Sequence, residues 1–350
     1  MARPETSPSG RVTLRQIAHA AKVSLMTVSY ALRDSSEVSA AERARIQALA
    51  RRMGYRPDPL LTHLMQHLRS HRKLKTIANL AVLTTLEAGF VRRLLDGAAI
   101  RAERLGYHLD RISLKPFLDN PRSLTRTLRA RGVSGVLIAP VADPASYSSL
   151  LDWTQFASVA MTYSVVEPHM HRVVTHHFDN AIKAFSLQRQ QGFRRIGLAM
   201  TSDMDFRANH SYSAAYYHVT GAAGAGTLPF LFLDEPNPRS IRRWFDRHRP
   251  DVIVAANAHQ VTEFIAPALS APARARTAFV CLDHDATHRV SGIDQLFETI
   301  GSHAVDTLVA QLHRNERGLP AKPTVTMVEG QWMDSGGLYP FGRANRPRGA

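Results

Sequence analysis

The pattern of polar and apolar positions in the first 54 residues predicts three short helices. Each begins at a hydroxyl residue that can accept a hydrogen bond from the first helical turn, and two of these starts have capping-box spacing. The starts are Thr13 with Gln16, Ser24, and Ser39 with Glu42. The helices should run to about Ala21, from Leu25 to about Leu32, and up to Gly54. Only three residues separate the first two helices, so they must cross steeply, as in a helix-turn-helix.

The second of these helices has a mixed exposed face. Its outward residues are expected to be Leu25, Met26, Thr27, Ser29, Tyr30 and Arg33. One interpretation is that Leu25 and Met26 pack against another domain. The other is that the start of the helix enters the DNA major groove, where apolar groups meet thymine methyls and polar groups meet base edges. The hydroxyls of Ser24, Thr27 and Ser29 suit phosphate contacts, which position a protein without reading sequence.

From residue 76 onward, short apolar runs alternate with helix-length segments. A helix is expected at Val91–Leu105. The expected buried strands are Ile77–Thr84, Gly135–Ala139, Ser158–Thr162, Arg195–Met200, Asp251–Ala256 and Ala278–Leu282. This alternation predicts parallel sheets covered by helices. Two successive sets predict two lobes with a ligand cleft at the carboxyl ends of the strands.

Positive charge is concentrated in the first fifth of the chain. The formal net charge of the 350 residues is +15. Residues 1–75 hold 14 Lys and Arg against 5 Asp and Glu, whereas residues 76–350 hold 30 against 24. A basic block attracts polyanions, either nucleic-acid phosphates or acidic lipids.

Other features of the composition indicate the compartment. The one cysteine, Cys281, cannot form an internal disulfide, so we expect a small buried hydrophobe in a reducing environment. The polar first ten residues lack the apolar region of a signal peptide. No apolar run approaches the ~20 residues of a membrane helix. We therefore expect a cytoplasmic protein without a membrane partner.

The residues from Val12 to Pro59 resemble the DNA-binding headpiece of the lactose-repressor (LacI/GalR) family. The matching residues are Val12-Thr13-Leu14, Ile17-Ala18, Ala21-Lys22-Val23-Ser24, Thr27-Val28-Ser29, Val38-Ser39 and Gly54-Tyr55-Arg56-Pro57. The resemblance implies that Leu25, Met26 and Tyr30 read bases. The residues expected on the DNA backbone are Thr13, Ser24, Thr27, Ser29 and Arg33. In two departures from the family, Lys22 replaces the usual glycine of the turn and Tyr30 stands where an arginine is common.

After Pro57 the family has a short hinge helix that wedges an apolar side chain into the minor groove. By the resemblance, Leu64 is the wedging residue and residues 58–75 form the hinge and a basic linker. Four leucines here fall at helical spacing: Leu60, Leu61, Leu64 and Leu68. The alternative is that they pack against a partner subunit or the headpiece.

The resemblance extends across the rest of the chain. The similar stretches are His176–Leu198, Val252–Gln260, Phe279–Asp285, Ser291–Leu312 and Gly318–Trp332. They imply a two-lobed α/β core like that of periplasmic sugar-binding proteins of type I, behind an all-α helix-turn-helix headpiece at residues 1–57. The implied layout is an N-lobe at residues 76–163 and 296–330, a C-lobe at 164–295, and a tail at 331–350.

The effector site follows from the same resemblance. By position, Asn257 and Asp283 match polar residues that bind the small molecule in relatives. Asn209 stands where an arginine is common, with Arg207 two residues earlier. The expected wall residues, on strand ends or adjacent loops, are Thr84, Tyr163 and Phe206. Ordinary packing or loop roles remain alternatives for each of them.

Catalytic and metal-binding patterns have no support. His169, His171, His176 and His177 are close in sequence, but no cysteine lies nearby, and we expect a histidine-rich surface loop. No Gly-x-Ser-x-Gly elbow, P-loop or dinucleotide fingerprint is present. We therefore expect no cofactor, no metal and no enzyme activity.

The sequence as a whole predicts a homodimeric regulator, usually a repressor in this family. Its partners would be a pseudo-palindromic double-stranded DNA operator and a small-molecule effector, for which a sugar is the candidate class. The alternative is a small-molecule-binding protein whose DNA binding is lost or non-specific.

Overall fold

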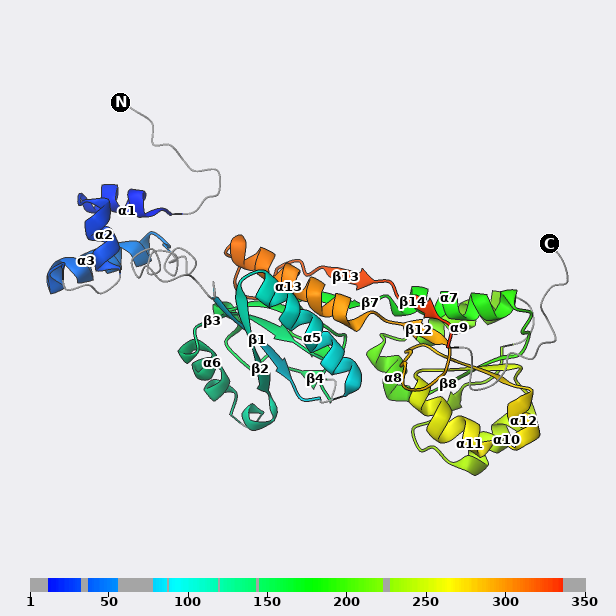
Figure 1. Ribbon diagram of the computed structural model, residues 1–350. Coiled ribbons are helices and arrows are strands. Elements are labelled where there is room, and N and C mark those ends of the chain that lie inside the picture. Colours follow the sequence, from blue (N-terminus) through cyan, green and yellow to red (C-terminus); the bar gives the residue numbers. More distant parts are fainter. Residues whose placement is uncertain are drawn as a thin grey trace. The chain divides into compact units, whose positions relative to one another are not determined.

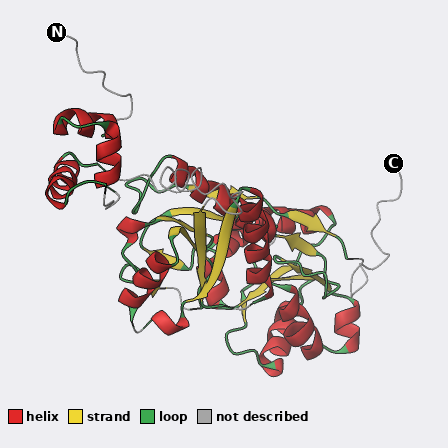
Figure 2. Cartoon of the chain, turned by 60° about the vertical axis from the view of Figure 1, so that its left-hand side comes forward, coloured by secondary structure: helices red, strands yellow, loops and turns green. Residues whose placement is uncertain are grey.

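The computed structural model describes residues 12–32, 37–55, 78–86, 88–118, 120–142, 145–222 and 227–335. The chain divides into two compact units, Met1–Leu74 and Lys75–Ala350. The first is helical and the second combines helices with strands (Figures 1 and 2). Each unit is described by itself below. No described helix has the length and apolar character needed to cross a membrane.

The described part of the first unit contains three helices. They are α1 (Leu14–Ala21), α2 (Leu25–Ala31) and α3 (Ala40–Arg52). The predicted helix starts are confirmed, because each hydroxyl accepts a hydrogen bond of 3.0–3.3 Å from a backbone N–H of the first turn. The pairs of hydroxyl and N–H residue are Thr13 with Gln16, Ser24 with Thr27, and Ser39 with Glu42. The small apolar core centres on Ile17, Val28, Ala31 and Ile46, which are fully buried.

The turn between α1 and α2 holds a lysine in the left-handed backbone region. Lys22 has φ 57° and ψ 41°, a conformation that a residue with a Cβ adopts at a cost. This is the position where the sequence departs from the usual glycine. By contrast, α3 ends as predicted, because Gly54 supplies a φ of +75° directly after the helix.

The second unit contains two six-stranded sheets within its described residues. In the first sheet the strand order is β13-β7-β5-β3-β1-β2, and all neighbouring pairs are parallel. The strands are β1 (Ala78–Thr84), β2 (Tyr107–Ser113), β3 (Val133–Ile138), β5 (Ala157–Ala160), β7 (His171–Thr175) and β13 (Val325–Val328). A small ladder joins β4 (Ala145–Ser146) to β6 (Val165–Glu167) beside this sheet.

The second sheet has the order β14-β12-β11-β10-β8-β9 and is parallel except for the β12–β14 pair. Its strands are β8 (Ile196–Met200), β9 (Leu231–Phe232), β10 (Val252–Ala255), β11 (Ala278–Cys281), β12 (Gly292–Asp294) and β14 (Gln331–Met333). Cys281 is fully buried in this sheet, which confirms it as a packing residue.

Helices cover both faces of each sheet. On the first sheet, α5 (Gly89–Arg104) and α13 (Phe297–His313) share one core and α6 (Pro121–Ala130) packs on the other face. On the second, α10 (Pro238–His248), the π-helix at Gln260–Ile265, α11 (Ala266–Ala268) and α12 (Ala271–Ala275) cover one face. The other face carries α7 (His177–Gln190) and α9 (Ser211–Ala222), with α8 (Ser202–Arg207) at its edge. The predicted two-lobed α/β core is confirmed.

Figure 1 shows α5 and α13 lying side by side over the first sheet. Two glycines allow this close approach. A Cβ on Gly97 would lie 2.0 Å from the Glu298 carbonyl oxygen, and one on Gly301 would lie 2.0 Å from the Leu94 carbonyl oxygen. The contact therefore fixes α13 firmly on the first lobe, directly after the chain leaves the second sheet.

The chain passes between the two sheets three times. The passages follow β7, β12 and β13. Two expected boundaries differ from this arrangement. The first sheet includes β7, which lies beyond the expected N-lobe limit at residue 163, and β14 pairs with β12 although a tail was expected from residue 331. Both differences come from short strands with polar residues, β7 and β14, which the layout implied by the resemblance had placed in the C-lobe and in the tail.

Candidate functional site

The outward face of α2 carries two large apolar side chains. Leu25 exposes 49% and Met26 58% of its surface, whereas Val28 and Ala31 are buried in the core of the unit. Adjacent exposed apolar side chains at a helix start are unfavourable in water and indicate a binding surface. The start of the second helix is also the part that a helix-turn-helix presents to the major groove.

The third expected base reader is placed differently. Tyr30 is half-buried and its ring packs against the core of the first unit, so only part of the side chain faces outward. The neighbouring Ser29 is also half-buried. The structure thus brings Leu25 and Met26 to the surface more fully than Tyr30.

Two of the expected backbone-contacting hydroxyls, those of Thr13 and Ser24, also cap helix starts. Thr13 caps α1, and Ser24 Oγ lies 2.8 Å from Thr27 Oγ1 at the start of α2. A hydroxyl has one proton and two lone pairs, so this capping role leaves capacity for a phosphate oxygen or a water. The expected contacts at Arg33 and Leu64, and the linker at 58–75, lie outside the described residues.

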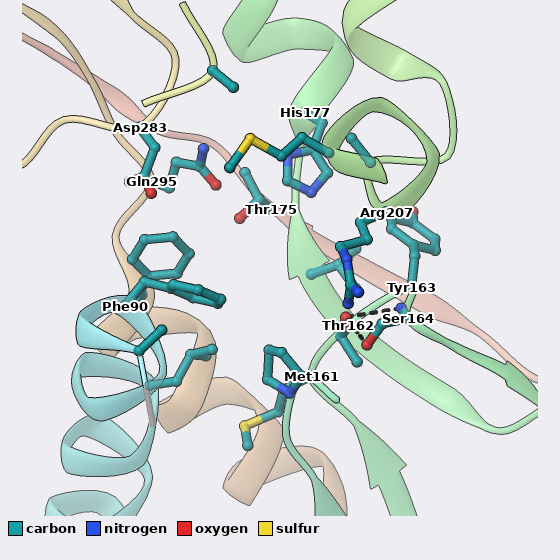
Figure 3. Close-up of a pocket in the computed structure, with 18 of the residues that line it drawn as sticks. Phe90, Met161, Thr162, Tyr163, Ser164, Thr175, His177, Arg207, Asp283 and Gln295 are labelled. Atoms are coloured by element: carbon teal, nitrogen blue, oxygen red, sulfur yellow. Dashed lines mark hydrogen bonds between the residues drawn. The ribbon is translucent and has the colours of Figure 1, made fainter. Parts of the chain in front are cut away.

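A cavity of about 400 Å³ lies between the two sheets of the second unit (Figure 3). Four of the expected effector residues line it: Tyr163, Arg207, Asn257 and Asp283. Thr84, Phe206 and Asn209 are not among the lining residues. The Thr84 hydroxyl bonds to backbone atoms of Leu86 and Pro140, and it therefore shapes two loops of the wall. Phe206 is 47% exposed on the outside of α8, and Asn209 lies in a left-handed turn with φ 54°.

Much of the cavity wall on the first lobe is apolar, although Thr162, Tyr163 and Ser164 also line it. Its large apolar side chains are Leu86, Phe90, Leu94, Met161, Phe297 and Ile300. The rings of Phe90 and Phe297 lie 5.4 Å apart and are tilted by 43°, a favourable aromatic contact. A ligand that enters from this side therefore meets a hydrophobic surface.

Polar side chains gather where the chain passes into the second lobe. Figure 3 shows Asp283, Gln295, Thr175 and His177 along one side of the cavity, with Phe90 and Met161 across from them. Asp283 and His177 retain some accessible surface only because they border the cavity, and both lie deep in the protein.

Burial shifts the protonation of these two groups. Removal from water raises the pKa of Asp283 to about 7, and the nearby Asp294 and Asp285 raise it further while Arg93 opposes them. Burial also lowers the pKa of His177 to about 4, with a smaller contribution from His176. At neutral pH, His177 is thus a neutral imidazole and Asp283 lies near its titration midpoint.

A hydrogen-bonded chain joins two of the passages between the lobes. Gln295, just after β12, donates from Nε2 to Tyr212 Oη at 3.1 Å and to the Leu282 carbonyl oxygen at 2.8 Å. Tyr212 Oη lies 2.8 Å from Nδ1 of His177, just after β7. Because the NH2 group of Gln295 can only donate, Tyr212 best satisfies its own proton by donating to Nδ1, which puts the imidazole proton on Nε2. Sequence reasoning singled out neither Gln295 nor Tyr212, because neither follows a buried strand of the predicted series, and it expected His177 in a histidine-rich surface loop.

Arg207 connects the lobes directly. Its guanidinium donates to the carbonyl oxygens of Val141, at 2.6 Å, and Ala142, both on the first lobe. It also forms an ion pair of 2.5 Å with Asp203 in its own helix. Three of its five N–H donors are therefore used by the protein in this arrangement, although the sequence predicted that the residue would bind the effector.

The histidines considered for a metal site have separate roles. His169 is exposed in a loop, His171 Nδ1 lies 2.7 Å from the Thr324 hydroxyl, His176 caps α7, and His177 borders the cavity. The expected histidine-rich surface loop is thus wrong for three of the four. A different group, His259, Glu263 and His288, does come together among the described residues. Their ligand atoms lie within 4.8 Å of one another and are of types that Zn²⁺ binds.

Comparison with known proteins agrees with this architecture. Residues 13–58 match the family model described as "Bacterial regulatory proteins, lacI family". No curated protein matches the chain. The predicted headpiece is therefore confirmed as a LacI-family DNA-binding domain.

Solved structures share the fold of nearly the whole chain. A complex described as transcriptional regulator CelR with cellobiose has 19% identity and a TM-score of 0.57, covering 92% of this chain and 98% of that one. The lac repressor dimer bound to operator and the anti-inducer ONPF has 17% identity and a TM-score of 0.55, covering 93% and 98%. A putative ribose operon repressor from Burkholderia thailandensis has 17% identity and a TM-score of 0.56, covering 73% and 99%. At these identities the likeness establishes the fold, which confirms the predicted architecture.

Proposed function

We propose that this chain, whose N-terminal domain is of the LacI family, is a homodimeric regulator that binds a pseudo-palindromic DNA operator under the control of a small effector. The single observation that carries the proposal is the family match of residues 13–58. It coincides with a capped helix-turn-helix whose α2 exposes Leu25 and Met26. Under this proposal the chain acts as a regulator rather than an enzyme. It would act as a repressor, which is the usual role in the family.

Reading of DNA would divide between two sets of side chains. Leu25 and Met26 would contact thymine methyl groups, and the exposed part of Tyr30 a base edge. The hydroxyls of Thr13, Ser24 and Thr27 would fix the orientation through phosphates. The net charge of +9 over residues 1–75 would supply most of the salt-dependent attraction.

The effector would act through the arrangement of the two lobes. Three chain passages join the lobes, and the cavity is lined by both. A ligand changes such an equilibrium only by binding one arrangement more tightly than the other. In a dimer, the preferred arrangement would set the spacing of the two headpieces and thereby operator affinity.

Selection from random duplexes tests the proposal. We expect the full-length protein to enrich a two-fold symmetric site, with affinity that falls steeply as salt rises. Met26→Ala and Tyr30→Ala should each relax preference at individual base pairs by about 1–3 kcal/mol. Arg243→Ala, an exposed change on α10, is the matched control and should alter nothing.

Two outcomes would count against this function. Failure to enrich a consensus would favour the alternative of a small-molecule-binding protein without specific DNA binding. A uniform loss of affinity across all sequences in the two headpiece variants would remove Met26 and Tyr30 from the base-reading set.

A further inference from the structure

Three polar side chains of the cavity lining are largely engaged by the protein itself. Arg207 is occupied by Asp203 and by two backbone carbonyls of the first lobe. Both Nε2 hydrogens of Gln295 are used, by Tyr212 and by the Leu282 carbonyl. The Asn257 carbonyl oxygen accepts from the Gln260 backbone N–H. These three side chains thus serve mainly the protein itself, and the uncharged hydroxyls of Tyr163 and Thr175 also line the cavity.

Asp283 is the second acidic residue of the lining, beside Asp203. It lines the cavity, and among the described residues none donates a hydrogen bond to its carboxyl group. Burying a carboxylate without a hydrogen-bond partner costs several kcal/mol of free energy. A ligand that donates a hydrogen bond to Asp283 removes this cost and therefore gains binding free energy from this one contact. Across the cavity stands the apolar wall of Phe90, Phe297 and their neighbours.

These walls disfavour a sugar. Each hydroxyl placed against an apolar surface loses its hydrogen bond to water, at a cost of about 1–3 kcal/mol. A monosaccharide carries hydroxyls around its whole ring, whereas the part of the cavity lined by Phe90, Leu94 and Phe297 offers them no polar partner. A molecule with one apolar part and one polar end suits the distribution better.

We propose, building on the regulator function above, that the effector is a small organic cation with an apolar body, such as an arylalkyl amine, whose ammonium group pairs with Asp283. The apolar body would lie against Phe90 and Phe297. Charge supports a cation, because Asp203 neutralises Arg207 while Asp283 forms no ion pair with another described residue. A cavity of about 400 Å³ suits a molecule of this kind, at the small end of the roughly 300–1,000 Å³ range of ligand pockets.

Binding of a cation should couple to protons. Burial holds the pKa of Asp283 at about 7, among Arg93 from α5, Asp294 from β12, Asp285 on the same loop and Tyr212 from α9. An ammonium group stabilises the carboxylate, so binding requires the ionised form. The affinity of the cation should therefore fall by about tenfold from pH 8 to pH 6, because the ionised fraction of Asp283 falls by that factor.

Four probes of matched size test the inference on the full-length protein: 2-phenylethylamine, 2-phenylethanol, 3-phenylpropanoate and glucose. Calorimetric titration and melting temperature are measured at both pH values. We expect the amine to bind most tightly and to lose affinity at the lower pH. The alcohol should bind more weakly and without this pH dependence. The carboxylate and glucose should not bind at millimolar concentration.

The isosteric variant Asp283→Asn isolates the contact. The amine should lose at least tenfold in affinity while the alcohol keeps its own, which also reports that the cavity is intact. Asp246→Asn, an exposed change on α10, is the control and should leave both unchanged. Should Asp283→Asn fail to fold, the pH dependence of the wild-type protein decides the question.

Three results would overturn the inference: tighter binding of glucose than of the amine, no binding by any phenyl probe, or amine binding insensitive to pH and to Asp283→Asn. Operator selection on the unliganded protein separates this failure from failure of the regulator function. A DNA consensus without amine binding rejects only the ligand class. Amine binding without a consensus rejects only the regulator.

Discussion

Replacing Arg207 with methionine should release the two lobes from each other. The arginine donates to the Val141 and Ala142 carbonyl oxygens across the cavity mouth. Methionine keeps much of the apolar length of the side chain but cannot donate a hydrogen bond. The substitution therefore removes the inter-lobe bonds with little loss of packing.

The magnitude follows from the environment of the side chain. Hydrogen bonds from a charged group contribute roughly 1.5–3 kcal/mol each. The Arg207 side chain is 25% exposed, so we take the lower value for each of the two bonds. The loss of about 3 kcal/mol would change the ratio of joined to separated lobes by about 100-fold.

Spin labels can measure this change. Cys281 is the single cysteine and is fully buried, so labels on Arg126→Cys in α6 and Arg243→Cys in α10 report one distance between the lobes. The Arg207→Met protein should show a longer and broader distance distribution. Arg274→Met is the control, because Arg274 also donates to backbone carbonyls, at 2.7 Å to Leu269, but within one lobe.

An unchanged distribution in the Arg207→Met protein would refute the reasoning. It would mean that the passages between the sheets, rather than the arginine, determine the arrangement of the lobes. Equal broadening in the Arg274→Met protein would show instead that loss of any buried arginine loosens the second lobe.

Three further predictions concern stability, each measured by urea denaturation of the full-length protein. Lys22→Gly should stabilise the first unit by about 1 kcal/mol, because Lys22 occupies the left-handed region, and Lys22→Ala should not. Gly97→Ala should cost about 3 kcal/mol or more because its Cβ would lie 2.0 Å from the Glu298 carbonyl oxygen. Gly89→Ala is the control, because Gly89 has open space around it. Equal stability of the Gly97→Ala and Gly89→Ala proteins would contradict the close packing of α5 against α13. Ser39→Ala should cost about 1 kcal/mol through loss of the α3 cap, and Ser39→Thr should retain most of it.

The features that the sequence predicts well are those decided locally. A helix start depends on one hydroxyl and the next three residues, so all three starts of the first unit are found. A central strand of a parallel sheet is apolar on both faces, and the six expected runs correspond to β1, β3, β5, β8, β10 and β11.

The strands that sequence reasoning misses have polar residues for structural reasons. The edge strand β2 carries His108, Asp110 and Arg111 on its partly exposed surface. In β7, Arg172 is buried but donates to the Thr162 carbonyl oxygen at 2.8 Å, which satisfies its charge locally. Neither strand therefore reads as an apolar run. Its polar residues are tolerated only because of where the strand lies in the folded sheet.

The same distinction applies to the cavity. Asn257 and Asp283 follow β10 and β11, and the carboxyl ends of neighbouring parallel strands meet at one edge, so their convergence is predictable. Gln295 and His177 meet only because two chain passages lie next to each other. That proximity is a property of the whole topology, and no local pattern in the sequence contains it.

The Gln295–Tyr212–His177 chain gives the cavity a route to the arrangement of the lobes. It joins the passages after β12 and β7, and its donor capacity is fully used only when both passages keep their present distance. Asp283 lines the same cavity and adds to the charge around the Tyr212 hydroxyl. A ligand that neutralises Asp283 therefore changes the environment of the bond between the passages without touching either one. A ligand transmits a signal only if it binds the two arrangements of the lobes with different affinity. We expect the contact between the ligand and Asp283 to produce that difference.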